Sequence, residues 1–402
     1  MGGRGDILDA RDAKMVPLWS LTNWDKRFNT VEKHKQDVVI KYHYYLAAEA
    51  DRLVVNGGDV KILTTYESDL WTSEDLVEGN VSSGEVVSIP WGGKPNVQYF
   101  KGRFITTDNR IATSKDTEVL DNRYLYCFML AKTELIGSFY RGASLKHPEM
   151  GKVLDLKIPL PSLSVQKRIA AVLDKICELK KNAETRLVKL DTLVKSRFVE
   201  MFGDTRSNSK ALPVRRLDGV CSSIVRGPFG SALKKEFFVV KGSNTYKVYE
   251  QKHAIQKNAT IGTYYIDADR FSELRRFECR PGDIIMSCSG TMGEFFQLPV
   301  GCEQGVMNQA LCKFSLSDAV LPVYFLNYMK NAIGLLRTQG SGIQNIAAVS
   351  YVKSMPFLLP SITLQREFAA FVERVDKLRE AARQTVEAMD TLYRSKLQEY
   401  FG

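Results

Sequence analysis

The sequence has few of the residues that metal sites and disulfide frameworks require. Its 402 residues include four histidines, none in an H-E-x-x-H or other paired spacing, which argues against a histidine metal site. The seven cysteines form an odd set without a C-x-x-C pair, so we interpret them as buried thiols of a reducing compartment. No apolar run approaches the roughly 20 residues that span a bilayer, and the N-terminus resembles neither an export signal nor a myristoylation site. We therefore expect a cytoplasmic protein without a metal.

Motifs of nucleotide and methyl-transfer chemistry are also missing. The sequence contains neither a G-x-x-x-x-G-K-[ST] phosphate loop nor a G-x-G-x-x-G dinucleotide fingerprint. Gly92-Gly93-Lys94 is followed by a proline and lacks the upstream glycine. The Asn/Asp-Pro-Pro-aromatic tetrapeptide of amino-methyltransferases does not occur either. We expect no catalytic residue and no cofactor in this chain.

The composition is that of a folded protein with a basic surface. Hydrophobic residues make up 44% and charged residues 25%, which is typical of globular chains. Because single cores usually stop growing near ~250–300 residues, 402 residues suggest two domains. The 56 basic and 46 acidic residues give a net charge of +10. This charge favours a polyanion such as nucleic acid or an acidic membrane, and it is equally compatible with plain solubility.

An internal repeat divides the chain into two halves. Three segments recur without a gap at an offset of 199 residues, and each pair shares most of its residue types. The paired segments are 161–171 and 360–370, 191–193 and 390–392, and 200–203 and 399–402. The β-type runs 84–89 and 282–287 also correspond, more weakly, at an offset of 198. The repeat is therefore half the chain long.

Each copy of the repeat ends in a segment that predicts one long helix. Pro161 and Pro360 precede the two helices, and Gly203 and Gly402 follow them. From Leu163 onward the first helix covers roughly 36 residues, or about 54 Å at ~1.5 Å per residue. Apolar and small residues recur in steps of three and four. The predicted seams are Ile169, Val172, Ile176, Leu179, Ala183, Leu190 and Leu193 in the first copy, and Phe368, Phe371, Val375, Leu378, Ala382, Met389 and Leu392 in the second.

These patterns predict an α+β fold built as a pseudo-two-fold repeat. Residues 1–160 and 205–359, with short β-type runs such as Val60 to Thr65, form two globular domains, and 161–204 and 360–402 form helical regions. The helices would most simply pair as an antiparallel coiled coil, with the globules at opposite ends. The alternative is that each helix packs only on its own globular half.

Several segments resemble the specificity subunit of type I restriction-modification systems. Residues 158–163, 166–169 and 190–203 resemble the central conserved region of that family. In the second half, 225–234 resembles a loop near the start of a target-recognition domain, and 280–285 with 289–291 resembles a later strand and turn. The resemblance covers nearly the whole chain and is weakest before residue 84.

This resemblance implies a non-catalytic reader of double-stranded DNA. Two target-recognition domains would each read half of an asymmetric, split sequence, and the helices would fix the unread spacer. Two methyltransferase subunits would dock on the helical regions, and restriction subunits would complete the complex. S-adenosylmethionine, ATP and magnesium would belong to those partners. A rod of about 54 Å also suits two reading surfaces about one duplex turn, ~34 Å, apart.

Candidate DNA-binding residues lie on polar and glycine-rich loops. Base reading uses Arg or Lys for guanine and Asn or Gln for adenine, whereas lysines mostly contact phosphates. The candidates are Trp91, Lys94, Asn96, Arg141, Ser144 and Lys146 in the first half, and Arg226, Ser231, Lys234, Lys235, Gln339, Ser341, Gln344 and Asn345 in the second. For each of these, the alternative is an ordinary solvated loop residue. We expect Asn109 and Asn308 to satisfy strand-end backbone groups instead.

The ends of the helices are candidates for partner binding. Phe202 and Phe401 would contact a methyltransferase subunit or, alternatively, cap the coil. Two other functions stay open: a stand-alone DNA-binding or scaffolding protein without a methyltransferase partner, and a nuclease that uses both globules.

Overall fold

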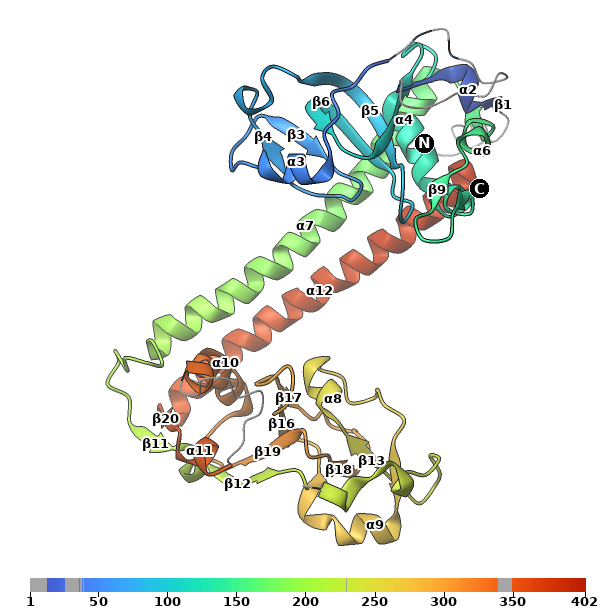
Figure 1. The fold of residues 1–402 in the computed structure, drawn as a ribbon. Coiled ribbons are helices and arrows are strands. Elements are labelled where there is room, and N and C mark those ends of the chain that lie inside the picture. Colours follow the sequence, from blue (N-terminus) through green and yellow to red (C-terminus); the bar gives the residue numbers. More distant parts are fainter. Residues whose placement is uncertain (1–12, 26–35, 37, 39, 229, 339–348) are drawn as a thin grey trace, which may run out of the picture. The chain divides into compact units, whose positions relative to one another are not determined.

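Two compact units make up the chain. The structure, a computed structural model, describes residues 13–25, 36, 38, 40–228, 230–338 and 349–402. Unit 1 comprises residues 1–184 and 383–402, and unit 2 comprises 185–382. The long helices α7 (Leu163–Phe202) and α12 (Ile362–Phe401), drawn green and red in Figure 1, each contribute to both units. The two units therefore divide inside the long helices.

Unit 1 is built on a six-stranded sheet in the order β2-β7-β5-β6-β3-β4. Only β3 and β6 pair in parallel, and the other neighbours are antiparallel. Two short antiparallel pairs, β1-β10 and β8-β9, lie outside this sheet. The strands are β1 (Lys14–Pro17), β2 (Thr22–Trp24), β3 (Val60–Leu63), β4 (Trp71–Thr72), β5 (Ser82–Pro90), β6 (Gln98–Thr106), β7 (Asn109–Ser114), β8 (Tyr140–Arg141), β9 (His147–Pro148) and β10 (Lys157–Leu160). The helices are α2 (Leu18–Leu21), α3 (Ala47–Arg52), η2 (Asp75–Val77), α4 (Asn122–Ala131), α5 (Thr133–Gly137) and α6 (Met150–Leu154).

Helix α4 forms the core of unit 1 with the sheet and the two long helices. Asp121 caps α4, because its carboxylate accepts a 2.8 Å hydrogen bond from the Tyr124 N–H. Tyr124 and Phe128 on this helix are fully buried, and both rings contact Phe401 at the end of α12. The beginning of α7 joins the same cluster through Ile169. In Figure 1, α4 lies beside β5.

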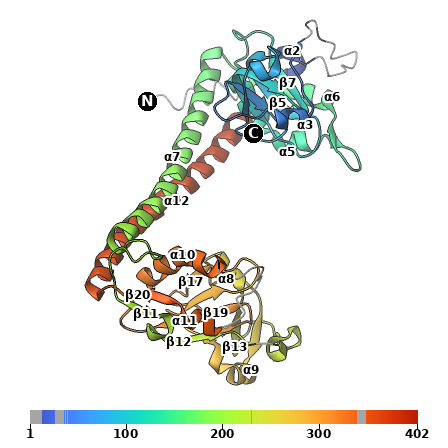
Figure 2. The same ribbon diagram turned by 60° about the vertical axis from the view of Figure 1, so that its left-hand side comes forward.

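Unit 2 contains two four-stranded sheets, β12-β19-β16-β17 and β14-β13-β18-β15, and the pair β11-β20. The strands are β11 (Val214–Arg216), β12 (Cys221–Arg226), β13 (Thr245–Tyr249), β14 (Tyr265–Asp267), β15 (Glu278–Cys279), β16 (Ile284–Ser287), β17 (Phe295–Gln297), β18 (Gly305–Met307), β19 (Leu311–Leu316) and β20 (Pro356–Leu358). The helices are η3 (Leu217–Gly219), η4 (Gly230–Leu233), η5 (Lys235–Phe237), α8 (Gln251–Ile255), α9 (Ala268–Glu273), η6 (Arg275–Phe277), α10 (Pro322–Thr338) and α11 (Val349–Ser354). In both Figure 1 and Figure 2, α10 lies beside the end of α7 and the beginning of α12.

A buried glutamine joins each long helix to the globular part before it. Gln166 donates from Nε2 to the carbonyls of Val119 and Pro161, both at 2.9 Å, and its Oε1 accepts from the Asp121 N–H at 3.0 Å. Gln365 makes the same three bonds, at 2.9–3.0 Å, with residues 199 or 200 positions later. Those partners are Ala319, Pro360 and Leu321. The repeat found in the sequence is therefore a repeat of contacts as well, and the predicted α+β class is confirmed.

The two long helices pack antiparallel in each unit. In unit 1, Lys180 on α7 donates to the Asp390 carboxylate on α12 at 2.7 Å. In unit 2, Arg379 on α12 donates to Asp191 on α7 at 2.6 Å. Asp191 and Asp390 are 199 residues apart, as are Lys180 and Arg379, so the two ion pairs are equivalent. The helices also pack on the globular parts, so the alternative that each helix packs only on its own globular half is wrong.

The predicted seam is correct for about half of its positions. Ile169, Ile176 and Leu190 of α7 are buried, as predicted. However, five seam residues point outward and are 39–53% exposed, because the buried face also uses positions such as Leu173 and Val194. The exposed seam residues are Val172, Leu179, Leu193, Leu378 and Leu392.

Candidate nucleic-acid interface

Two predicted DNA-binding loops of unit 1 lie against each other. One follows β5 and covers Trp91 to Asn96, and the other, residues 142–146, joins β8 and β9. The Gly93 N–H donates to the Lys146 carbonyl at 3.1 Å. His147 Nδ1 lies 2.7 Å from the Trp91 carbonyl, and because a carbonyl only accepts, this nitrogen is the donor. The structure therefore brings together two loops that lie about 50 residues apart in the sequence.

The side chains on these two loops differ in their exposure to solvent. Lys94, Arg141, Ser144 and Lys146 are exposed. Arg141 Nε lies 3.5 Å from the Glu149 carboxylate, a half-exposed pair that contributes little to stability. The four exposed residues form a positively charged surface suited to phosphates and base edges.

The Trp91 and Asn96 side chains contact other residues of unit 1. The Arg110 guanidinium lies 3.8 Å from the centroid of the Trp91 ring. The centroid of the His147 ring lies 4.9 Å from the same Trp91 centroid. Asn96 Nδ2 donates to the Thr65 carbonyl at 3.4 Å. These contacts give Trp91 and Asn96 a supporting role for the loop. Sequence reasoning missed Arg110 and His147, since nothing in the local pattern indicates which side chains stack on Trp91.

The glycine-rich loop of unit 2 lies at the end of β12. The Gly227 N–H donates to the Leu311 carbonyl at 2.9 Å. A Cβ at this position would lie 1.8 Å from the Asn308 carbonyl oxygen, so the close approach of the two chains requires glycine. Arg226, which precedes it, is half-buried, and its Nε lies 3.5 Å from the Gln309 carbonyl. The loop is thus held against the turn between β18 and β19.

Further cations extend this surface of unit 2. Lys234 and Lys235 are exposed, and Lys234 Nζ lies 3.6 Å from the Glu236 carboxylate. Arg275 and Arg276 of η6 are exposed as well. Phe277 of η6 and Phe238 after η5 both pack against the same small apolar cluster. The consecutive arginines were the sequence signal that could have found η6.

Two asparagines satisfy backbone groups, as predicted. Asn109 Nδ2 donates to the carbonyls of Leu63 and Thr64 at 2.9 and 3.0 Å. The Asn308 side-chain oxygen accepts from the Ala310 N–H at 3.0 Å. The remaining predicted residues, Gln339, Ser341, Gln344, Asn345 and the side chain of Ser231, lie outside the described part of the chain.

Comparison with known proteins relates part of this chain to a known family. Residues 80–190, which span β5 to the first two-thirds of α7, match the family model described as "Type I restriction modification DNA specificity domain". Residues 80–190 are therefore similar to type I DNA specificity domains. This confirms the family resemblance that the sequence predicted, and the match includes both loops of unit 1 and the Gln166 contacts.

Relatives of the specificity-domain family agree in sequence and in fold. A Haemophilus influenzae protein named as a type I restriction enzyme specificity subunit is 25% identical over 252 residues, which is 55% of this chain and 57% of that protein. The type I restriction-modification S subunit of M. genitalium has a TM-score of 0.59 at 14% identity and covers 97% of both chains. A structure titled for complex assembly and conformational transition of the type I R-M system has a TM-score of 0.56 at 17% identity, covering 80% of this chain and 83% of that one. The structural likeness establishes the fold.

Phe202 and Phe401 have the capping role that the sequence analysis gave as the alternative. Phe202 is 1% exposed and packs on Tyr324 of α10 and Phe368 of α12, with ring centroids 4.7 and 5.4 Å apart. Phe401 is 4% exposed and packs on Tyr124. A partner cannot reach side chains buried this deeply, so the expected direct contact is corrected for both residues.

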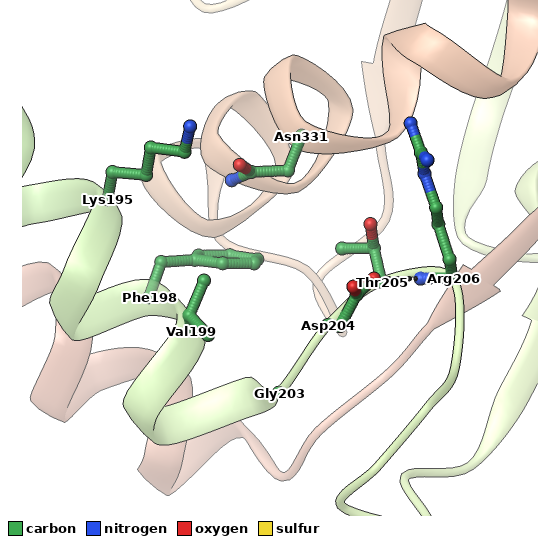
Figure 3. Close-up of a pocket in the computed structure, with 8 residues that line it drawn as sticks. All are labelled: Lys195, Phe198, Val199, Gly203, Asp204, Thr205, Arg206 and Asn331. Atoms are coloured by element: carbon green, nitrogen blue, oxygen red, sulfur yellow. Dashed lines mark hydrogen bonds between the residues drawn. The ribbon is translucent and has the colours of Figure 1, made fainter.

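A surface hollow of about 200 Å³ follows the end of α7 in unit 2 (Figure 3). Figure 3 shows the Lys195 side chain extending beside Asn331, with Arg206 on the other side of the hollow. The Arg206 N–H donates to the Asp204 carboxylate at 2.7 Å, and Gly203 has a φ of 78°, which ends the helix in the left-handed conformation. Polar side chains and the buried Phe198 line this hollow.

The seven cysteines are free thiols that differ in burial. Burial raises the pKa of the Cys127 thiol to about 12. Cys279, Cys288 and Cys312 are also buried, whereas Cys177 on α7 is exposed, so the expectation of core thiols is wrong for Cys177. No group of three or more His, Cys, Asp or Glu side chains in the described ranges is placed to hold a metal ion. Within the same ranges, no helix is both long and apolar enough to cross a membrane.

Proposed function

We propose that this chain is the DNA sequence-specificity subunit of a type I restriction-modification complex. Each target-recognition domain reads one half of a bipartite, asymmetric target, and the antiparallel long helices determine the unread spacer. The chain performs no catalysis in this proposal. S-adenosylmethionine, ATP and magnesium are bound by methyltransferase and restriction subunits.

One observation carries this proposal: the two halves of the chain share the contacts of their long helices but carry different basic loops. Gln166 and Gln365 make equivalent contacts, and so do the two ion pairs between α7 and α12. The loops do not repeat, because unit 1 presents Lys94 and Lys146 whereas unit 2 presents a glycine-rich loop with Lys235. Equal frameworks suit two identical methyltransferase subunits, and different loops suit two different half-sites.

The outward apolar residues of the helices support methyltransferase docking. Val172 and Leu179 are 40% and 42% exposed on α7 in unit 1. Val172, Arg168 and Tyr400 border a hollow of about 320 Å³ in the same unit. Apolar surface that the chain's own core leaves uncovered is suited to a partner's helix.

Co-purification with the cognate methyltransferase subunit tests the proposal. We expect a complex with two methyltransferase subunits per chain that methylates adenine at one split site, mapped by sequencing modified adenines. V172D/L179D should weaken this complex without lowering the melting temperature, because both side chains are exposed. L76D, at a 46% exposed leucine of η2, is the matched control and should assemble normally.

The outcome separates the proposal from its alternatives. A chain that binds DNA but forms no complex would be a stand-alone DNA-binding or scaffolding protein. Cleavage of DNA by the purified chain alone would contradict the non-catalytic role.

A further inference from the structure

We propose that Leu145 reads the 5-methyl group of a thymine in the half-site bound by unit 1. This inference rests on the proposed DNA-reading function and adds a specificity residue to it. Leu145 is 54% exposed, although it lies among polar and basic neighbours at the tip of the β8-β9 hairpin. Its fixed position and its surroundings indicate the ligand.

The hairpin holds the backbone of Leu145 in place. Tyr140 pairs with Pro148, and Arg141 with His147, in an antiparallel register. Gly142 has a φ of 139°, and a Cβ there would lie 2.2 Å from the Leu145 carbonyl oxygen. The turn is therefore closed so tightly that only glycine fits opposite Leu145.

The neighbouring loop supports one side of the Leu145 side chain. A Cβ built on Gly92 would lie 3.2 Å from Leu145 Cγ and Cδ2, so the leucine rests directly on the Gly92 backbone. The Gly93 N–H donates to the Lys146 carbonyl at 3.1 Å, and the Tyr140 hydroxyl donates to the Pro90 carbonyl at 2.8 Å. These bonds fix the hairpin to the loop after β5, and the outer side of Leu145 stays exposed.

The surroundings of Leu145 are those of a DNA contact. Lys94 and Lys146 are exposed on the two joined loops, and Ser144 precedes the leucine. Lysines in such a place contact phosphates and position the protein on the duplex. The thymine 5-methyl is the apolar group that the major groove presents, and apolar side chains recognise it. An exposed apolar side chain on two joined loops that also carry Lys94 and Lys146 matches that group.

Uracil substitution tests this inference on the full chain in its methyltransferase complex. Each thymine of the mapped target is replaced in turn by deoxyuridine, which removes only the methyl group, and the dissociation constant is measured. For the wild type we expect one position at which uracil weakens binding about fourfold, which corresponds to about 0.8 kcal/mol for one buried methyl group. L145A should bind thymine and uracil equally at that position.

The control variant is L76A, which removes a similarly exposed leucine of unit 1 and should keep the fourfold difference. Sequence-selective binding without any uracil-sensitive position would overturn the inference and leave the proposed function standing. If L145A kept the fourfold difference between thymine and uracil, the inference would also be overturned and the proposed function would stand. Binding without any sequence preference would overturn both.

Discussion

At the scale of single residues, buried polar side chains connect the repeat to the fold. A buried amide is costly unless its atoms are paired. Gln166 and Gln365 are both 0% exposed and make three hydrogen bonds each. Gln365 satisfies the Leu321 N–H just before α10, so it ties the beginning of α12 to the core of unit 2.

Replacement of Gln365 by alanine should therefore destabilise the protein. The change leaves the part-buried Leu321 N–H without its side-chain partner and opens a small cavity, which together cost about 2–4 kcal/mol. Urea unfolding followed by circular dichroism measures the loss. Q398A, at an exposed glutamine of the same helix, should change stability by less than about 0.5 kcal/mol. Equal effects of the two changes would contradict the role of Gln365.

His253 makes the stability of unit 2 depend on pH. It is fully buried, its Nδ1 accepts from the Glu250 N–H at 2.8 Å, and its Nε2 lies 2.7 Å from the Ile261 carbonyl. Burial lowers the pKa of His253. A lowered pKa means that the unfolded chain binds the proton more readily, so the contribution is full above the unfolded pKa of about 6.5 and is lost as the pH falls below it.

We expect the midpoint of urea unfolding of unit 2 to decrease between pH 7.5 and 5.5. The variant H253Q should be less stable at pH 7.5 but should show a smaller decrease over this range. H43Q, at an exposed histidine of unit 1, is the control and should keep the wild-type slope. A pH dependence unchanged in H253Q would assign the effect to other groups.

At the scale of elements, the antiparallel register of α7 and α12 depends on charge as well as apolar packing. The Lys180 and Asp390 side chains are 35% and 44% exposed, so their attraction is screened by water. Ion pairs of this kind contribute little energy, but they disfavour a shifted register, in which like charges would meet.

A charge swap at this pair tests the register. K180E and D390K should each lower the free energy of unfolding by about 0.5–1 kcal/mol, because each places like charges together. The double variant K180E/D390K should recover most of the loss. Thermal unfolding of the four proteins gives the coupling energy, and losses that simply add in the double variant would show that the two side chains do not interact.

At the scale of the whole molecule, the net charge of +10 predicts a strong salt dependence of DNA binding. Exposed cations gather on the loops of unit 1 and on the η5 and η6 segments of unit 2. Each phosphate contact releases counterions, so the slope of affinity against salt counts the contacts.

The variant K94Q/K146Q should weaken binding to every DNA sequence and reduce the slope of log K against log salt by about two. K115Q removes an exposed lysine directly after the last residue of β7 and should leave the slope unchanged. Fluorescence anisotropy from 50 to 300 mM salt measures both. If the double variant kept the wild-type slope, these lysines would not contact phosphates.

The sequence by itself determined the repeat, the two long helices and the α+β class, because these depend on short-range spacing that a chain carries in one dimension. Proline before each helix, glycine after it and the recurring Gln166 and Gln365 were all visible there. Only the tertiary structure decided which side chains are free to bind. The Arg110 guanidinium lies over the Trp91 ring, and Phe401 is buried against Tyr124. Both contacts join segments far apart in the sequence. The same packing leaves Leu145 exposed.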